Sequence, residues 1–345
     1  MIWKSKRLWG SVIAVLLLAF CVKDVRLDDI ISLSHRINFI YLLPATAAAF
    51  VFIALKALRW RLVVSQHKSI RWWRCLTLYS AGQILNVVMP VLTGQIGRIL
   101  LFSKKVGLRK SFVFSTIFLE VLFDAVTLVL FLFLTSLAFV FPSEYRHVSV
   151  ILLVVTSCVV ALLYGMLTFQ NGIQKWVQKH IGSRWRGVSI SIRKFFRSFT
   201  KGIRLLRSTP HLVGAVTISL FSWVAHALVI YYLFRCFDFG LPFASACAVM
   251  IINTLALMVP ITPGNAGTFE LAVTASLTAF SINRADAVLF AISLHLLDLL
   301  PIFVMGSFFM QSDKASIAEV KRQADILAHQ QALEKQVAVT RRGRG

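Results

Sequence analysis

The sequence has few acidic residues and long stretches with none. It has 14 Asp and Glu residues against 37 Lys and Arg, and a formal net charge of +23. No acidic residue occurs from Ile30 to Leu119, nor from Tyr145 to Phe237. Such a charge is typical of nucleic-acid-binding proteins. Here, however, the basic residues lie in short segments between apolar runs, as in the loops of membrane proteins. We therefore expect no nucleic-acid partner.

Motifs for metal binding and catalysis are missing as well. The five cysteines are scattered through apolar segments without CxxC spacing, which excludes a zinc site or a disulfide framework of the usual kinds. No group of His, Cys and carboxylate residues has metal-ligand spacing, and there is no Ser/His/Asp motif, P-loop or GxGxxG. We expect no catalytic residues, no metal and no cofactor, and hence a protein that is not an enzyme.

The sequence is instead rich in apolar residues. Hydrophobic residues make up 58%, 28 residues are Phe, and the mean hydropathy is +0.77. A soluble domain could not bury so much apolar surface, so we predict an all-α, polytopic membrane protein. The run from Leu8 to Val22 has the length of a signal peptide, but the residues after it offer no small-residue cleavage site. We interpret it as a retained anchor.

The positions of the basic residues predict the topology. Lys4, Lys6 and Arg7 place the N-terminus in the cytoplasm, and the loop 170–209 carries ten basic residues and no acid. This loop is either an ordinary cytoplasmic loop or an amphipathic element that contacts anionic lipid. The distribution predicts about six full spans, the second at about 37–58, with both termini cytoplasmic.

Two apolar stretches contain the same pattern, PxxxGxxG. It reads "PVLTGQIG" at 90–97 and "PITPGNAG" at 260–267. The charges around 75–102 and 241–281 require each stretch to return to the side it entered from, so we predict two re-entrant hairpins. Irregular backbone is tolerated at membrane depth where protein or a wet cavity surrounds it. The alternative is that both patterns are Pro/Gly kinks that help helices to pack.

With these hairpins, the chain forms an inverted repeat. The first repeat runs from about 37 to 141 and the second from about 211 to 310, within a transmembrane domain at 1–311. A polar tail follows at 312–345. Secondary transporters are built from inverted repeats whose broken helices bind the substrate near the midplane. The sequence therefore predicts a substrate site at the two PxxxGxxG patterns.

Carboxylates occur inside apolar segments. Glu120 and Asp124 lie four residues apart in one span, on one helix face, and Asp298 lies in the last span beside His295. Such residues cannot face lipid, because an intramembrane carboxylate costs about 2.5–3.5 kcal/mol. We expect Arg98 to be the counter-charge, in one cluster with Glu120 and Asp124. The alternatives are polar contacts that join helices, a helix N-terminal acid at Glu270, and a packed histidine at His226.

The helix breaks also offer hydrogen-bonding groups. Unpaired amides and the positive dipole end of a restarting helix attract anions such as a phosphate head group. Thr93 and Thr262 add hydroxyls, Thr268 is a candidate N-cap, and Asn86 and Asn253 precede the two prolines. Glycine allows a head group to approach the main chain.

Four segments carry a resemblance to a known family: "SAGQILNVVMPVLTGQIGRILLF", "FLEVLFD", "NTLALMVPITPGNAGTFE" and "AISLHLLDLLP". They resemble the transmembrane region of lysylphosphatidylglycerol synthases and its stand-alone relatives, the flippase-like membrane proteins. The resemblance extends from about residue 8 to 311. It implies a bacterial inner-membrane protein that moves an amphipathic lipid between leaflets. The sequence departs from the family pattern at Val121, often a basic residue, and at Asn265, often a glycine.

The residues and the resemblance together predict a lipid-binding site. Its members lie at the two patterns or inside the spans: Asn86, Pro90, Gly94, Gly97, Arg98, Glu120, Asp124, Asn253, Pro260, Pro263, Gly264, Gly267, Glu270 and Asp298. All but Asn253 and Asp298 are positions of the family's motifs.

The predicted function is that of a flippase-like transporter. It would move a phospho- or glycolipid between leaflets of the inner membrane. The alternative is a non-catalytic membrane subunit that positions a lipid-modifying or glycosyl-transferring enzyme. Expected partners are membrane lipids, either anionic phospholipids or lipid-linked intermediates, with a homodimer or a lipid-modifying enzyme as further candidates. Because the chain ends 34 residues after the last predicted span, we expect no aminoacyl-transferring domain.

Overall fold

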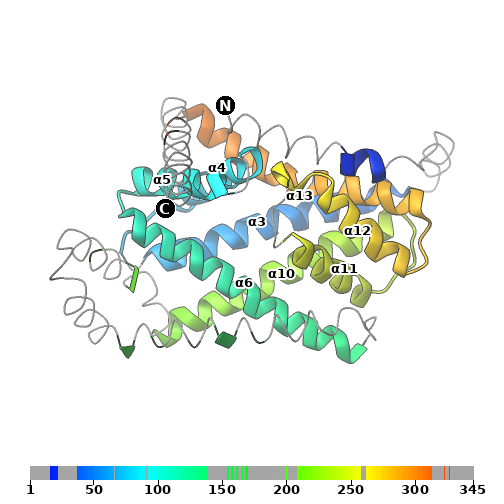
Figure 1. Cartoon of the computed structure of the whole chain (residues 1–345), viewed down its shortest axis with the longest axis horizontal. Helices are drawn as coiled ribbons and strands as arrows, with labels where there is room; N and C mark the ends of the chain where they lie inside the picture. The colour runs from blue at the N-terminus through cyan, green and yellow to red at the C-terminus, as the bar shows by residue number, and fades with distance from the viewer. Residues whose placement is uncertain are drawn as a thin grey trace, which may run out of the picture. The chain divides into compact units, whose positions relative to one another are not determined.

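The computed structural model describes most of the predicted transmembrane region (Figure 1). The described residues are 16–21, 37–65, 67–89, 92–138, 208–257 and 262–312, with isolated positions at 154, 157, 158, 161, 165, 168, 169, 194, 199, 200, 322 and 326. The basic loop 170–209 and the tail 312–345 lie almost entirely outside this part. Of the predicted anchor only residues 16–21 are described, and of the apolar run 147–169 only isolated positions.

Every regular element in the described ranges is a helix, which confirms the all-α class. In chain order they are η1 (Phe39–Tyr41), α3 (Leu42–Ser65), α4 (Trp72–Val88), α5 (Leu92–Val106), α6 (Lys110–Ala138), α10 (Thr209–Cys236), α11 (Phe243–Ala256), η3 (Pro263–Asn265), α12 (Thr268–Ala279) and α13 (Arg284–Ser312).

Four of the described helices are long and apolar enough to cross a membrane. They cover Phe39–Ser65, Lys110–Thr135, Thr209–Cys236 and Arg284–Gln311. These spans confirm a multi-pass membrane protein, while the total of about six stays a prediction. The second span ends at Ser65, seven residues beyond its predicted end, so the basic residues that follow the apolar run belong to α3.

Both PxxxGxxG patterns interrupt helices, as predicted. α4 ends at Val88 and α5 begins at Leu92, whereas α11 ends at Ala256 and α12 begins at Thr268. The two prolines that open the patterns, Pro90 and Pro260, lie outside the described residues. Each pattern thus joins two helices too short to cross a bilayer of about 30 Å.

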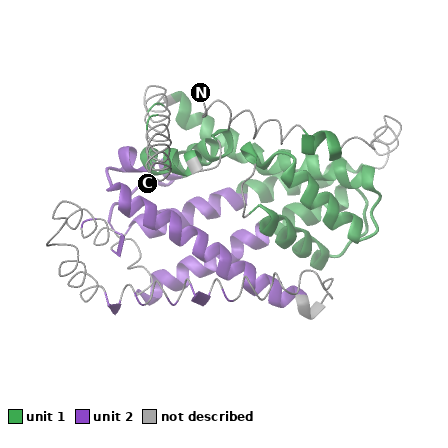
Figure 2. Ribbon diagram, viewed as in Figure 1, with its two compact units in different colours: residues 1–50, 76–101, 226–345 green, residues 51–75, 102–225 purple. Residues whose placement is uncertain are grey.

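The chain forms two compact units (Figure 2), and each is described by itself. Unit 1 contains residues 1–50, 76–101 and 226–345, and unit 2 contains 51–75 and 102–225. The path of the chain changes unit inside α3, α4, α5 and α10.

Unit 2 has an apolar core between α3, α6 and α10. Leu119, Leu122 and Phe123 of α6 pack with Val63 of α3 and Ala215 of α10. The Trp60 ring lies 4.3 Å from the Phe102 ring, and its indole N–H donates to Thr116 Oγ1 at 3.3 Å. These contacts hold α6 against α3 at the level of Glu120 and Asp124.

Unit 1 packs α13 against several other helices. Phe290 of α13 lies 5.3 Å, centroid to centroid, from both Phe234 and Phe237 at the end of α10. Further along α13, a Cβ at Gly306 would collide with Ile84 and would lie 3.1 Å from the Ala81 nitrogen of α4. The missing side chain therefore allows α13 to pack closely on α4, as small residues do at membrane helix contacts.

Candidate functional site

The second helix break has a tight, left-handed backbone. Gly264, Asn265 and Gly267 have φ values of 62°, 59° and 83°. The Thr262 hydroxyl donates to the Ala266 carbonyl at 2.8 Å and closes the turn. The departure from the family pattern at Asn265 now has a physical reason, because asparagine tolerates this conformation better than other residues with a side chain.

The two helix breaks contact each other within unit 1. A Cβ at Gly264, in the second break, would lie 3.3 Å from Val87 Cγ1 and 3.5 Å from the Val87 carbonyl oxygen, at the end of α4. Val87 and Gly264 are far apart in the sequence. The glycine therefore allows the backbone of the second break to approach the end of the first broken helix.

The first break is closed by glycines of α5. A Cβ at Gly94 would lie 2.7 Å from Asn86 Cα and 2.9 Å from the Leu85 carbonyl oxygen, both main-chain atoms of α4. A Cβ at Gly97 would lie 3.3 Å from Met89 Sδ. Close packing of α5 on α4 thus accounts for both glycines, and their role in lipid binding stays a prediction.

Glu270 connects the second break to α13. Its Oε2 accepts the Gly267 N–H at 2.6 Å, and its Oε1 is hydrogen-bonded to His295 Nδ1 at 2.7 Å. The N-cap position belongs to Gly267, so Thr268 is the first helical residue of α12 rather than the predicted N-cap. The His295 ring stacks on Phe269 with 4.3 Å between centroids. Glu270 is therefore both a helix N-terminal acid and a buried partner of a histidine.

A second histidine–carboxylate pair lies in the same unit. His226 Nε2 of α10 lies 3.2 Å and 3.3 Å from the two carboxylate oxygens of Asp298. His226 is 6% exposed. Asp298 lies three residues after His295 on α13, so both pairs use one face of that helix. His226 was considered a packed histidine from the sequence, but the structure gives it a carboxylate partner.

Two further predicted site residues of unit 1 are buried. Arg98 is 3% exposed, with its guanidinium carbon 4.9 Å from the centre of the Tyr79 ring. Asn253, near the end of α11, is 2% exposed, and its side-chain oxygen has no hydrogen-bond partner in the part of the chain that the structure describes. A buried amide oxygen without a partner is unusual in a folded protein.

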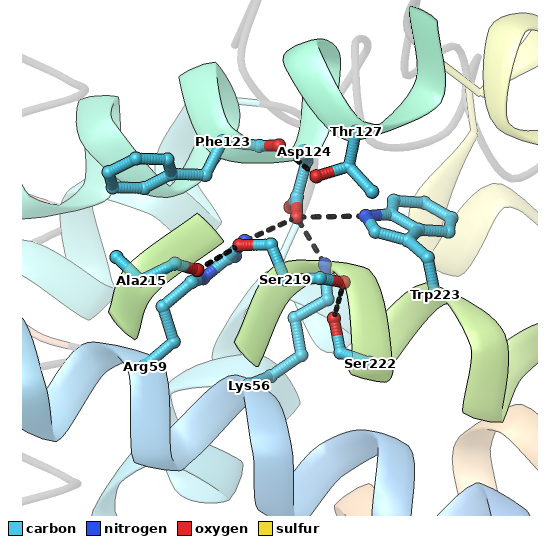
Figure 3. A network of polar contacts seen from close by, with 9 residues as sticks. All are labelled: Lys56, Arg59, Phe123, Asp124, Thr127, Ala215, Ser219, Ser222 and Trp223. Atoms are coloured by element: carbon cyan, nitrogen blue, oxygen red, sulfur yellow. Dashed lines mark hydrogen bonds and ion pairs between the residues drawn. The ribbon is translucent and has the colours of Figure 1, made fainter. Parts of the chain in front are cut away.

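Unit 2 contains an ionic network around Asp124 (Figure 3). Lys56 Nζ and Arg59 Nη1, both from α3, donate to its carboxylate at 2.7 Å and 2.8 Å. The Trp223 indole N–H of α10 donates to the same carboxylate at 3.2 Å, and Arg59 Nη1 also donates to Ser219 Oγ at 2.8 Å. One carboxylate thus joins three helices.

This network corrects the assignment of Arg98 as the counter-charge of Asp124. Lys56 and Arg59 fill that role, and they are 8% and 2% exposed. Sequence reasoning missed both: Lys56 lies inside the predicted second span but was not considered as a partner, and Arg59 lies just beyond the predicted end of that span. The available signal was two cations three residues apart, on one helix face, directly after an apolar run.

Glu120 lies one turn before Asp124 on α6. It is within electrostatic range of Lys56 and lines a small pocket in unit 2. The other lining residues are Arg59, Trp60, Val63, Thr116 and Phe123. The predicted common face of Glu120 and Asp124 is therefore directed at basic residues.

The predicted site residues divide between the two units. Unit 1 contains Asn86, Gly94, Gly97, Arg98, Asn253, Pro263, Gly264, Gly267, Glu270 and Asp298, and unit 2 contains Glu120 and Asp124. Within the described residues, no group of three or more His, Cys, Asp or Glu side chains is arranged to hold a metal ion.

The broken helices and buried ion pairs agree with a comparison to known families. The family model of the lysylphosphatidylglycerol synthase TM region matches residues 7–306. The chain belongs to this family. The match covers α3 to α13 nearly completely, so the two helix breaks and both sets of ion pairs described above lie within the lysylphosphatidylglycerol synthase TM region.

Two archaeal membrane proteins are similar to this member of the family. UPF0104 membrane protein MJ1078 of Methanocaldococcus jannaschii is 23% identical over 226 residues, which are 65% of this chain and 91% of that protein. UPF0104 membrane protein MJ1595 of the same organism is 22% identical over 289 residues, 80% of this chain and 85% of that protein. No solved structure matches the chain.

Proposed function

We propose that the protein is a lipid transporter of the flippase type, which moves a phospho- or glycolipid between the leaflets of a bacterial inner membrane and is not an enzyme. One observation carries the proposal: the two helix breaks meet at Gly264 and Val87 within one compact unit. Broken helices that meet in this way form the substrate sites of secondary transporters.

The groups around the two breaks suit a lipid head group. Asn253 offers a buried amide oxygen that has no partner among the described residues, and Arg98 is a buried cation directly after the first pattern. A polar head group can bond to both kinds of group, while the many apolar side chains around them suit acyl chains. The substrate therefore combines a polar head with an apolar tail.

An inverted repeat is the second element of the proposal. α6 and α13 are each 29 residues long, and Asp124 and Asp298 each lie at the fifteenth position. Each aspartate pairs with a basic side chain from the first helix of its own repeat, Arg59 on α3 and His226 on α10. The two aspartates lie at matching positions and have matching basic partners, which supports two copies of one repeat, each with a re-entrant hairpin.

Labelling from the two sides of the membrane tests this topology. Cysteines introduced at Lys104 and Asn283, both exposed, should react with a membrane-impermeant maleimide from opposite sides, Lys104→Cys from the cytoplasmic side. Of the five native cysteines, Cys158 is exposed and should first be replaced by serine, whereas the other four are buried. Labelling of both positions from the same side would contradict the inverted repeat.

Lipid exchange in proteoliposomes tests the function. The purified protein should accelerate the movement of fluorescent phosphatidylglycerol between leaflets. The Asn253→Leu variant should lower the rate about tenfold or more, because a hydrogen bond to a charged group contributes about 1.5–3 kcal/mol. Its thermal midpoint should stay equal or rise, since leucine removes a buried oxygen that has no partner in the described part of the chain.

The neighbouring Thr254→Val variant is the matched control. The Thr254 hydroxyl is already bonded to the Met250 carbonyl within α11 at 2.7 Å, so its loss should leave lipid exchange unchanged. If wild-type protein fails to accelerate exchange of any phospholipid, the transporter proposal is wrong and the scaffold function takes its place. If Asn253→Leu and Thr254→Val lose lipid exchange to the same extent, Asn253 does not belong to the lipid site.

A further inference from the structure

The two histidine–carboxylate pairs of unit 1 lie on one face of α13 and mark a polar path. It leads from His226 on α10 to Asp298 on α13, then along one face of α13 to His295, and from His295 to Glu270 on α12. Glu270 in turn accepts the Gly267 N–H in the second helix break. The path thus connects the middle of a membrane span with the backbone of the break.

The charge of each pair depends on one proton. An ionised carboxylate only accepts hydrogen bonds, so the bonded ring nitrogen of each histidine carries a proton. With a neutral imidazole the pair has a net charge of −1, and an additional proton on the other ring nitrogen makes it neutral.

The first repeat carries an arginine at the corresponding position. Asp124 is held by Arg59 and Lys56, and an arginine stays charged at all physiological pH values. His226 is the partner of Asp298 at the matching position of the second repeat. Histidine is the side chain that ordinarily changes its charge between about pH 5 and 8. The two repeats therefore differ in whether the central pair responds to pH.

We propose that the His226–Asp298 and His295–Glu270 pairs form a proton-binding site whose occupancy controls the second helix break, so that lipid movement is coupled to protons. The coupling rests on the function proposed above. No ligand other than the proton is required, because each pair gains a proton on an imidazole nitrogen and loses it again without any other bond being made or broken.

Glu270 transmits the change to the lipid site. Its two oxygens are shared between His295 and the Gly267 amide. When His295 is cationic, it attracts the carboxylate more strongly, and the stacked Phe269 ring stabilises the cation. The hydrogen bond to Gly267 then weakens. Gly267 lies three residues after Gly264, the residue that contacts Val87, so protonation acts where the two breaks meet.

Other titratable groups face this site from neighbouring elements. Cys21, in the helical segment 16–21, lies within electrostatic range of Glu270 and of Arg284 at the start of α13. The Arg284 guanidinium donates to the Phe20 carbonyl at 3.2 Å. Arginine does not titrate in this range, and a thiol ordinarily titrates above it. The two histidines therefore dominate the expected response between about pH 5.5 and 8.

The test compares lipid exchange at several pH values in proteoliposomes. Exchange of a short-chain fluorescent phosphatidylglycerol is followed by extraction with albumin, with the same pH on both sides. The wild-type rate should change about tenfold between about pH 5.5 and 8. In the double variant His226→Gln with His295→Gln, the rate should vary less than about twofold, because glutamine keeps an N–H donor but cannot titrate.

A third histidine supplies the matched control. His211 lies at the start of α10 and is hydrogen-bonded to Ser208, apart from both pairs. His211→Gln should retain the wild-type pH profile. An unchanged pH profile in the double variant would overturn the proposal, as would loss of the profile in the His211→Gln control.

The thermal midpoint in detergent provides a readout that does not depend on transport. A proton bound more tightly by the folded state stabilises it. The midpoint of the wild type should therefore change between about pH 5.5 and 8, and the double variant should show a smaller change. Equal changes in both proteins would overturn the proton site. If the pH dependence of the midpoint requires the two histidines but the protein exchanges no lipid at any pH, the proposed function and the coupling are both wrong.

Discussion

Replacing Asp124 with asparagine should lower the free energy of unfolding by about 3–5 kcal/mol, the cost of removing one partner from a buried ion pair. The change leaves Lys56 and Arg59, which are 8% and 2% exposed, without their shared carboxylate. Asparagine keeps only one oxygen acceptor, so at least one of the donors that now contact the two Asp124 oxygens loses its partner. Unfolding in mixed micelles measures the effect, and the control Asp238→Asn, at an exposed position after α10 whose positive φ of 55° asparagine tolerates, should cost less than about 1 kcal/mol.

A second change should compensate in part. Combining Asp124→Asn with Lys56→Met removes one of the two stranded cations, so the double variant should be less destabilised than the sum of the single variants, by at least about 1 kcal/mol. Simple additivity of the two changes would contradict a shared network. The double variant would also separate the role of Asp124 in folding from its predicted role in lipid binding. If stability is restored but lipid exchange is not, Asp124 is needed for transport as well as for folding.

Gly94→Ala should be the most damaging of the small changes in α5. The new Cβ would lie 2.7 Å from Asn86 Cα and 2.9 Å from the Leu85 carbonyl oxygen. Both are main-chain atoms, so α4 and α5 must separate to make room. Overpacking of this kind costs about 1–3 kcal/mol, and here the cost should be at the upper end.

Gly97→Ala is the matched control in the same helix. Its new Cβ would lie 3.3 Å from Met89 Sδ, which belongs to a flexible side chain that can move away. The thermal midpoint in detergent should therefore fall clearly for Gly94→Ala and little for Gly97→Ala. An equal or larger fall for Gly97→Ala would show that α5 does not pack on α4 as described.

The amino-acid sequence determined several features of the protein without the structure. Its composition required an all-α membrane protein, and its motifs placed it in the family that the comparison confirms. The two PxxxGxxG patterns located both helix breaks to within a few residues, because proline and glycine disfavour helices whatever surrounds them. Charged residues inside apolar runs marked the polar positions, because lipid excludes them.

Only the tertiary structure decided which of these residues meet. Asp124 pairs with Lys56 and Arg59, which lie 68 and 65 residues earlier, and Gly264 contacts Val87 of the other broken helix. In a soluble helix the apolar face shows which side is buried. In a membrane helix the sides that face lipid and protein are both apolar, so the sequence does not show which faces pack together. The partners of each buried charge therefore depend on helix packing that the sequence leaves open.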